Sequence, residues 1–103
     1  MHVSIIALPK ITDPRGNLTF IQKGHGLPFA PKRVFWTFNV PSGASRGGHA
    51  YLKQSELIVP INGSFEVVVT KTDGQEERYF LNRGDQGALL PPLTWSSMEN
   101  FST

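Results

Sequence analysis

Glycine and proline recur so often along this chain that a long helix has no room to form. The 103 residues contain 10 Gly and 8 Pro, and the longest stretches free of both, residues 49–59 and 93–103, have eleven residues each. Gly weakens a helix interior and Pro breaks it, whereas both residues are common in the turns between strands. The sequence therefore predicts an all-β protein of short strands and tight turns.

Two runs rich in β-branched residues flank the dipeptide Asn62-Gly63. Asn-Gly is the strongest short-range signal for a two-residue hairpin turn, so residues 55–61 and 64–70 are expected to pair as an antiparallel hairpin. Asp73-Gly74 predicts a second hairpin, with residues 76–81 as its returning strand. Further strands are predicted at residues 3–7, 18–22, 33–40, 88–90 and 95–99.

About nine or ten short strands must hide the edges of their sheets, either by closing into a barrel or by pairing two sheets. A jelly-roll barrel does this with hairpins of the kind predicted here. The length of 103 residues and the hydrophobic content of 39% suit a globular protein with one modest core. We therefore expect a single domain that spans residues 1–103.

The charge and composition of the chain argue against several classes of partner. The net charge of +2 comes from 10 Lys and Arg against 8 Asp and Glu, without any basic run, so no nucleic-acid surface is predicted. There is no Cys for a disulfide or a thiolate metal site. No apolar run approaches the roughly 20 residues that span a bilayer, and no signal peptide is evident. We expect a cytoplasmic protein without a membrane partner.

The spacing of a few residues in the middle of the chain indicates one particular barrel. The first motif of the cupins, Gly-x5-His-x-His-x4-Glu-x6-Gly, is matched at Gly43, His49, Glu56 and Gly63, with Tyr51 in place of the second His. In a metal-binding cupin, the two His and the Glu point into the barrel from one β-hairpin. The resemblance predicts a cupin-type jelly-roll barrel.

The same pattern argues against a metal in that barrel. The fourth cupin ligand, usually a His from a later strand, corresponds to Ser96. Only His49 and Glu56 remain as ordinary ligands, because a neutral phenol at Tyr51 and a neutral hydroxyl at Ser96 bind transition metals poorly. We therefore predict no metal and no other cofactor, and we disfavour a metal-dependent oxygenase.

Six short motifs occur in order between residues 13 and 102. They are Asp13-x-Arg15-Gly16-x-Leu18, Pro28-Phe29, Lys32-Arg33-Val34-Phe35, Arg46-Gly47-x-His49-Ala50, Asn62-Gly63-Ser64 and Trp95-x-x-Met98-x-x-Phe101-Ser102. Together they resemble the WxcM-like cupin family of nucleotide-sugar 3,4-ketoisomerases, which act on dTDP-4-keto-6-deoxyglucose. The resemblance implies a metal-independent isomerase that supplies deoxysugars for surface polysaccharide.

The reaction that the resemblance implies moves a carbonyl between adjacent sugar carbons through an enediol. It needs a base near neutral pKa, and an imidazole, whose ordinary pKa is about 6.5, is the natural candidate. We predict that His49 is this base. The family's second catalytic His is Tyr51 here. A phenol with an ordinary pKa of about 10 is a poor base but can relay a proton between substrate oxygens, so Tyr51 is predicted either as a catalytic donor or as a pocket wall.

Six further residues are predicted to bind the nucleotide-diphosphate sugar: Arg15, Arg33, Arg46, Glu56, Trp36 and Trp95. A guanidinium can bind pyrophosphate with two hydrogen bonds, although an isolated Arg is more often a surface residue. An indole can stack on a base or a sugar, although Trp in a small β domain is more often part of the core. The carboxyl group of Glu56 is expected to orient His49 or to act as a second acid.

Two questions stay open at this point. The loss of the second His also fits a cupin that binds a sugar nucleotide without catalysis, so a binding module is the main alternative to an isomerase. Family members continue past Phe101-Ser102, so the domain 1–103 is expected to lack a C-terminal strand and tail that a partner subunit could replace. Because the charged fraction of 17% is also below the roughly 25% of typical soluble domains, we expect a homodimer.

Overall fold

The computed structural model describes residues 2–102, and these residues form nine strands and no helix. The strands are β1 (Ser4–Ala7), β2 (Lys10–Asp13), β3 (Gly16–Thr19), β4 (Arg46–His49), β5 (Glu56–Ile58), β6 (Phe65–Thr70), β7 (Glu76–Leu81), β8 (Gln86–Leu90) and β9 (Trp95–Glu99). Within this range nothing resembles a membrane-spanning helix. The all-β prediction and the expected number of strands are confirmed.

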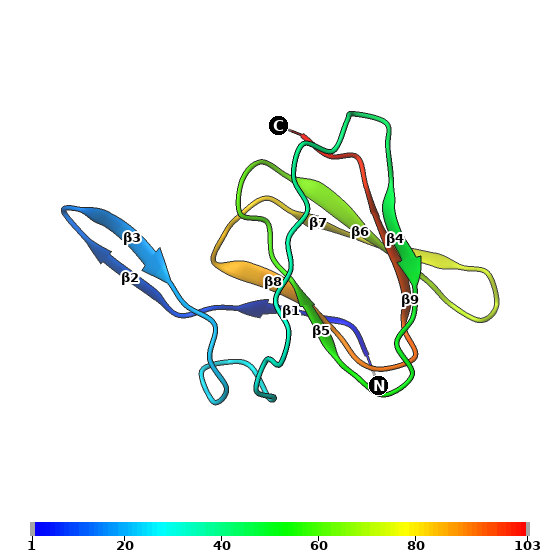
Figure 1. The fold of residues 1–103 in the computed structure, drawn as a ribbon, viewed down its shortest axis with the longest axis horizontal. Helices are drawn as coiled ribbons and strands as arrows, with labels where there is room; N and C mark the ends of the chain where they lie inside the picture. Colours follow the sequence, from blue (N-terminus) through cyan, green and yellow to red (C-terminus); the bar gives the residue numbers. More distant parts are fainter. Residues whose placement is uncertain (1, 103) are drawn as a thin grey trace.

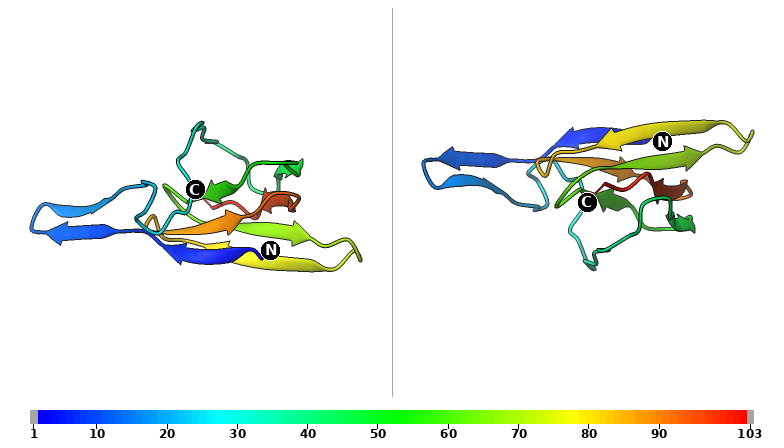
Figure 2. Two further views of the ribbon diagram at one scale, coloured as in Figure 1. Left: turned by 90° about the horizontal axis from the view of Figure 1, so that it is seen from below. Right: turned by 90° about the horizontal axis from the view of Figure 1, so that it is seen from above.

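Two antiparallel sheets form the body of the molecule, and a hairpin extends away from it. One sheet has the order β1-β8-β5 and the other the order β4-β9-β6-β7. The hairpin of β2 and β3 projects beyond both sheets (Figures 1 and 2). We call this hairpin the arm. The arm includes part of the predicted strand at residues 18–22, but its first strand was not predicted.

The apolar core lies between the two main sheets. Phe65, Val67 and Val69 occupy alternate positions of β6, and all three are buried. They pack with Leu81 of β7 and with residues of β8. Alternate residues of a strand point to opposite faces of its sheet, so the period of two in β6 aims one set of side chains inward. The predicted hairpin across Asp73-Gly74 is present as β6 and β7. The two strands are antiparallel: Thr70 lies opposite Glu76 at the turn end, and Phe65 lies opposite Leu81 at the other end.

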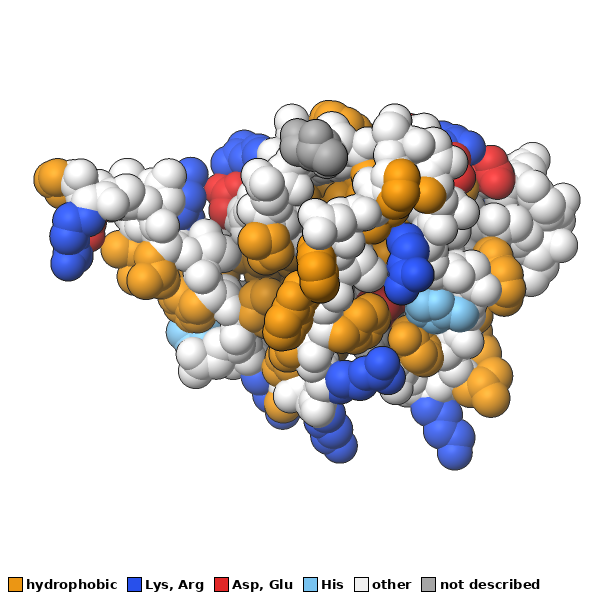
Figure 3. All heavy atoms as spheres, turned by 45° about the horizontal axis from the view of Figure 1, so that its top comes forward, with side chains coloured by type: hydrophobic (Ala, Val, Ile, Leu, Met, Phe, Trp, Pro, Cys, Tyr) orange, Lys and Arg blue, Asp and Glu red, His pale blue; other side chains and the backbone are white. Residues whose placement is uncertain are grey.

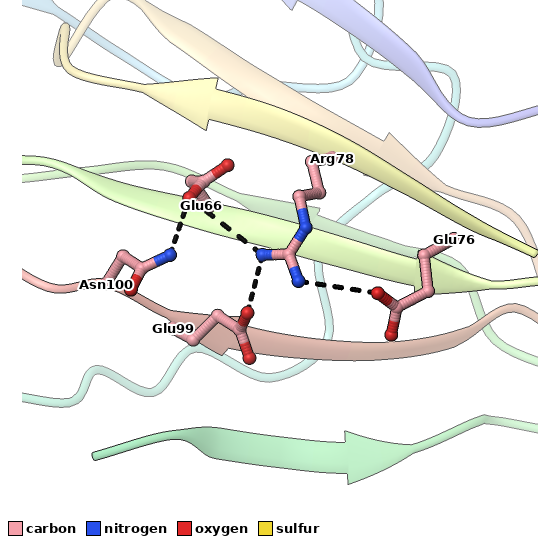
Figure 4. Close-up of polar contacts among 5 residues, drawn as sticks. All are labelled: Glu66, Glu76, Arg78, Glu99 and Asn100. Carbon is pink, nitrogen blue, oxygen red and sulfur yellow. Dashed lines mark hydrogen bonds and ion pairs between the residues drawn. The ribbon is translucent and has the colours of Figure 1, made fainter. Parts of the chain in front are cut away.

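A group of charged side chains ties three strands together on the outer face of the four-stranded sheet. Arg78 of β7 lies 2.5 Å from Glu99 and 3.3 Å from Glu76, and Asn100 donates a hydrogen bond of 2.6 Å to Glu66 (Figure 4). These residues come from β6, β7 and β9 or lie next to them. The group stabilises the sheet from the side opposite the core.

The hairpin predicted across Asn62-Gly63 is wrong. β5 pairs with β8, whereas β6 pairs with β7 and β9, so the two predicted partners lie in different sheets. A type I′ hairpin turn needs positive φ at both central residues, and only Gly63 has it, with a φ of +70°. The chain crosses between sheets here through Pro60, which is fully buried and has no N–H for a strand ladder.

The strand predicted at residues 33–40 is also absent. This segment, which we call the strap, runs as irregular chain in front of the strands in Figure 1. Its alternating apolar residues suggested a strand, but a strand needs a hydrogen-bonded neighbour. None of the described strands pairs with the strap, and Trp36 and Phe38 are each 72% exposed.

Candidate active site

Two strands of the larger sheet place His49 at the inner face of the barrel. His49 ends β4 and lies opposite Ser96 of β9, which is buried. The register between the strands shifts between Gly47 and His49, as in a β-bulge. A bulge turns the following side chain and is frequent beside active sites. A Cβ atom at Gly47 would lie 3.2 Å from the Cα atom of Ser97, so Gly permits the close approach of β4 to β9.

The smaller sheet brings Glu56 to the same place from the opposite side. Glu56 begins β5 and lies opposite Leu90 of β8, a residue of the apolar core. Its Oε2 atom is 3.9 Å from Nε2 of His49, and its side chain is only 15% exposed. Burial raises the pKa of Glu56, while the charge of a protonated His49 would lower it. The barrel therefore joins an imidazole and a carboxyl group from different sheets, and the single hairpin expected for the two residues from the cupin pattern is wrong.

The Nε2 atom of His49 is buried but has no hydrogen-bond partner among the described residues. Buried polar atoms in proteins nearly always have a partner, and exceptions often mark functional positions. The imidazole as a whole is 39% exposed, so the site is open on one side. The arrangement suits a group that exchanges a proton with a bound molecule.

The ring of Tyr51 packs against the imidazole ring of His49 in an edge contact. The ring centroids of Tyr51 and His49 are 4.7 Å apart, and the planes are inclined at 67°. The backbone N–H of Leu93 donates a hydrogen bond of 2.7 Å to the carbonyl of Tyr51. Leu93 has a φ of +66°, which is costly for a side chain of this kind. The turn between β8 and β9 thus holds Tyr51 in place beside His49.

A cavity of about 650 Å³ opens next to Glu56. The strap forms one wall with Val34, Phe35 and Trp36, and residues from both sheets form the rest. Hydrophobic side chains gather on the face of the molecule that the strap crosses (Figure 3). Among the described residues that line the cavity, Glu56 is the one with an ionisable side chain. Volumes of 300 to 1,000 Å³, roughly, are usual for small-ligand pockets.

The structure brings only some of the predicted binding residues to this region. Trp36 lines the large cavity and shares a second cavity of about 500 Å³ with Arg46. The guanidinium of Arg33 lies 4.9 Å from the ring centre of Phe35, a residue of the large cavity. Of these three predicted residues, Trp36 lines the large cavity itself, Arg46 lines the second cavity, and Arg33 is near the large cavity through its contact with Phe35.

Two predicted binding residues lie elsewhere in this chain. Arg15 is at the tip of the arm, where it forms an ion pair of 2.7 Å with Asp13, far from β4 and β5 in Figure 1. Trp95 pairs with Thr70 on β6. Its side chain therefore points to the sheet face opposite Ser96 and the core. Neither residue reaches the cavity of its own chain.

Sequence reasoning missed most of the lining of the cavity. The strap residues Phe35, Phe38 and Asn39 line it, as do Met98 and Phe101. The run of apolar residues on the strap was the available signal, and the sequence interpretation assigned it to a strand. Asn39 has a φ of +56°, a conformation that Asn tolerates better than most residues.

The residues near His49 do not form an ordinary metal site. Within residues 2–102, no group of three or more His, Cys, Asp or Glu side chains is close enough together to hold an ion. His49 and Glu56 supply one imidazole and one carboxylate. The absence of a metal cofactor stays a prediction.

Comparison with known proteins assigns the whole chain to one family. The family model described as "FdtA: WxcM-like, C-terminal" matches residues 1–103. One relative is TDP-4-oxo-6-deoxy-alpha-D-glucose-3,4-oxoisomerase of Aneurinibacillus thermoaerophilus, which is 32% identical in sequence to this chain. The alignment covers the whole of this chain and 73% of the length of the relative.

Solved structures of 3,4-ketoisomerases have the same fold. A mutant of QdtA from Thermoanaerobacterium thermosaccharolyticum, in complex with TDP-4-keto-6-deoxyglucose, matches with a TM-score of 0.90 at 30% identity, over 97% of this chain and 72% of that one. WlaRA of Campylobacter jejuni, a TDP-fucose-3,4-ketoisomerase, matches with a TM-score of 0.89 at 27% identity, over 99% and 75% of the two chains. The predicted cupin-type jelly-roll barrel is confirmed.

Proposed function

We propose that this chain, which belongs to the WxcM-like, C-terminal family of FdtA proteins, is a 3,4-ketoisomerase of a TDP-linked 4-keto-6-deoxy sugar. Its relatives in sequence and structure are named as isomerases of this kind. The observation that carries the proposal is the unpartnered Nε2 atom of His49, which lies 3.9 Å from Glu56. Glu56 in turn lines a cavity of ligand size, although His49 itself is not one of the residues that line it. Catalysis is favoured over a binding module, because simple binding requires no pair of proton-transfer groups.

His49 is the base in this proposal. It takes the proton from C3 of the 4-keto sugar and returns a proton to C4, which moves the carbonyl from C4 to C3. A neutral imidazole can accept a proton near physiological pH and release it again within one catalytic cycle. Tyr51 supports the imidazole through its ring, since the two rings are in edge contact.

The nucleotide end of the substrate is assigned to the region around the strap. The indole of Trp36 offers a stacking surface beside Arg46, whose guanidinium suits a diphosphate. Arg33 is close enough to Phe35, a lining residue, to contribute a second positive charge near the cavity. We place the reaction in the cytoplasm and in the supply of deoxysugars for surface polysaccharide, as the resemblance implies.

We also propose that the chain forms a homodimer, with the arm as the contact. Ile11 of β2 and Leu18 of β3 lie directly opposite each other, and each is 55% exposed. Apolar side chains are visible on the arm in Figure 3. A second copy could cover them and bring Arg15 near a cavity. Whether residues 1–103 form a complete domain stays a prediction.

Proton exchange at the substrate tests the proposed activity. Incubation of the protein with TDP-4-keto-6-deoxyglucose in deuterated water should yield the 3-keto isomer with deuterium at C4, together with exchange at C3 of the substrate. Nuclear magnetic resonance detects both. If the protein binds this sugar nucleotide but catalyses neither isomerisation nor exchange, the binding module is the correct function.

A further inference from the structure

We infer that Glu56 is a second catalytic residue of this site, which moves a proton between the two substrate oxygens while His49 moves the carbon-bound proton. The inference rests on the proposed function, because a second transfer is needed only if the chain interconverts 4-keto and 3-keto sugars. Where the family pattern has a second His, this chain has Tyr51. The proton transfer between oxygens is therefore the step without an evident catalyst.

The chemistry requires two coupled proton transfers. As His49 takes the proton from C3, the electrons of the C3–H bond form a C3–C4 double bond, and the carbonyl oxygen on C4 takes a proton from the Glu56 carboxyl group. The product is an enediol beside an imidazolium and a carboxylate. The hydroxyl on C3 then gives its proton to Glu56, and the imidazolium returns a proton to C4. Both side chains end the cycle as they began, so no further reactant is needed.

The position of Glu56 suits this role better than that of Tyr51. Glu56 lines the cavity of about 650 Å³, whereas neither Tyr51 nor His49 is among the described residues that line it. His49 reaches this region through its Nε2 atom, 3.9 Å from Glu56. The distance of 3.9 Å between Glu56 and His49 is too long for a direct hydrogen bond. Each group therefore remains free to bond with the substrate. The two groups are also close enough to reach adjacent atoms of one sugar ring.

The surroundings of Glu56 favour the protonated form that the first step needs. Burial raises its pKa, and the opposing effect comes from the charge of His49. His49 on β4 is the charged group whose effect on Glu56 opposes that of burial, and Tyr51 packs on the His49 ring. Arg46, also on β4, lines the second cavity. The remaining neighbours on β8 and β9 do not ionise in the physiological range: Leu90, Ser96 and Met98.

The pair of Glu56 and His49 would share one proton. In the proposed cycle this proton starts on Glu56, so that the first step begins with two neutral groups. After the first step His49 is positive and Glu56 negative, 3.9 Å apart in a half-buried site. Their attraction exists in the enediol state and not in the resting state, and only such differential stabilisation accelerates a reaction.

The substitution Glu56→Gln tests this role. Gln has the same size and can form hydrogen bonds but cannot give up a proton at working pH, so turnover should fall by about 10² to 10⁴ while KM changes little. Glu56→Asp keeps the carboxyl group and should recover part of the rate. Glu76→Gln, on the outer face of the sheet, is the matched control and should behave like the wild type. Binding of TDP by each variant shows that the barrel is intact.

The pH profile separates a catalytic role from a structural one. The wild-type rate should fall on the alkaline side when the pair loses its shared proton. This fall should disappear in Glu56→Gln, since Gln has no such proton to lose, and it should return in Glu56→Asp. Loss of rate through a distorted barrel would leave the alkaline fall in place.

Three results would overturn the inference, and they distinguish its failure from the failure of the proposed function. If the wild type isomerises the sugar and Glu56→Gln keeps its rate and its alkaline fall, Glu56 is not the relay although the proposed function stands. If Tyr51→Phe, rather than Glu56→Gln, abolishes the alkaline fall, Tyr51 is the relay. If the wild type itself neither isomerises nor exchanges the substrate, the proposed function and the inference fail together.

Discussion

His49 is the residue on which the proposed chemistry depends most directly. Its Nε2 atom is buried without a partner, while the opposite carboxyl group is too far away to bind it. An unpaired buried nitrogen lowers stability by an amount on the order of 1–3 kcal/mol. A bound substrate can offset this cost by supplying the missing partner, so the resting site is poised for a ligand.

We expect His49→Asn to remove catalysis while leaving binding nearly intact. Asn has a hydrogen-bonding side chain but cannot accept the C3 proton, so turnover should fall by at least about 10² to 10⁴. Titration of the variant with TDP should give nearly the wild-type affinity. His25→Asn is a suitable control, because His25 packs on Phe20 in a loop before the strap. A variant at residue 49 with the wild-type rate would contradict the role of His49.

We expect Tyr51→Phe to lower the rate by less than about tenfold. Phe keeps the ring that contacts the imidazole at a centroid distance of 4.7 Å and loses only the hydroxyl group. Steady-state kinetics with the 4-keto sugar would measure the effect. A fall in the range of about 10² to 10⁴ would instead indicate that the phenol transfers a proton.

Among the connecting elements, the crossing from β5 to β6 joins the two halves of the site. Glu56 begins β5, and the chain then passes to the other sheet through Pro60 and Gly63. A Cβ atom at Gly63 would lie 2.6 Å from the carbonyl oxygen of Ser102. The N–H of Ser64 also donates a hydrogen bond of 2.8 Å to the Ser102 hydroxyl. Gly63 is thus required for the close approach of the last described residues.

Gly63→Ala should destabilise the fold by about 2 kcal/mol or more, because it adds both a clash and a strained φ of +70°. Unfolding in urea would measure the loss. Gly84→Ala is the matched control, since a Cβ atom there would be 3.5 Å from its nearest neighbour, with no such strain in φ. Equal stability of the two variants would show that the packing against Ser102 is unimportant.

The turn between β7 and β8 is held to the start of the chain by Asp85. Its carboxylate accepts hydrogen bonds from Arg83 and lies 3.3 Å from Lys10. Its backbone carbonyl accepts a hydrogen bond from the N–H of Leu8. The hydrogen bonds from Arg83 are the main cause that lowers the pKa of Asp85 to about 2, from an ordinary value of 3.8.

Because this pKa is lower in the folded state, the stabilisation is present above about pH 4 and is lost as the pH falls towards 2. Asp85→Asn should therefore be less stable than the wild type at pH 7, and the difference should shrink between pH 4 and 2. Thermal unfolding across this range would test the prediction. Asp73→Asn, in the turn between β6 and β7, provides a control with no ion pair to Arg or Lys. A pH-independent difference would mean that charge is not involved.

The molecule as a whole is more extended than its length requires. Its radius of gyration is 14.0 Å, compared with about 13 Å for a compact chain of this size. Its longest dimension is 47 Å against a shortest of 21 Å. The arm accounts for this shape in Figure 1, and its apolar pair of Ile11 and Leu18 is exposed.

Light scattering at micromolar concentration should give the mass of two chains. Leu18→Glu should shift this mass towards one chain, because a charge in an apolar contact is costly to bury. Asn17→Glu is the control, since Asn17 lies on the other face of the arm, where it bonds with Thr12. A monomeric wild type would contradict the proposed dimer.

The sequence by itself determined the fold class, the family and the pairing of His49 with Glu56. The frequent Gly and Pro determined the fold class, because they allow only short strands. The spacing of the cupin motif determined that His49 and Glu56 both point into the barrel. Only the tertiary structure decided how the strands pair and what forms the cavity. The turn preference of Asn62-Gly63 concerns only four consecutive residues. The actual partners of β5 and β6 are β7, β8 and β9, which come later in the chain. The strap shows the same limit, because alternating side chains become a strand only where another strand supplies the backbone hydrogen bonds.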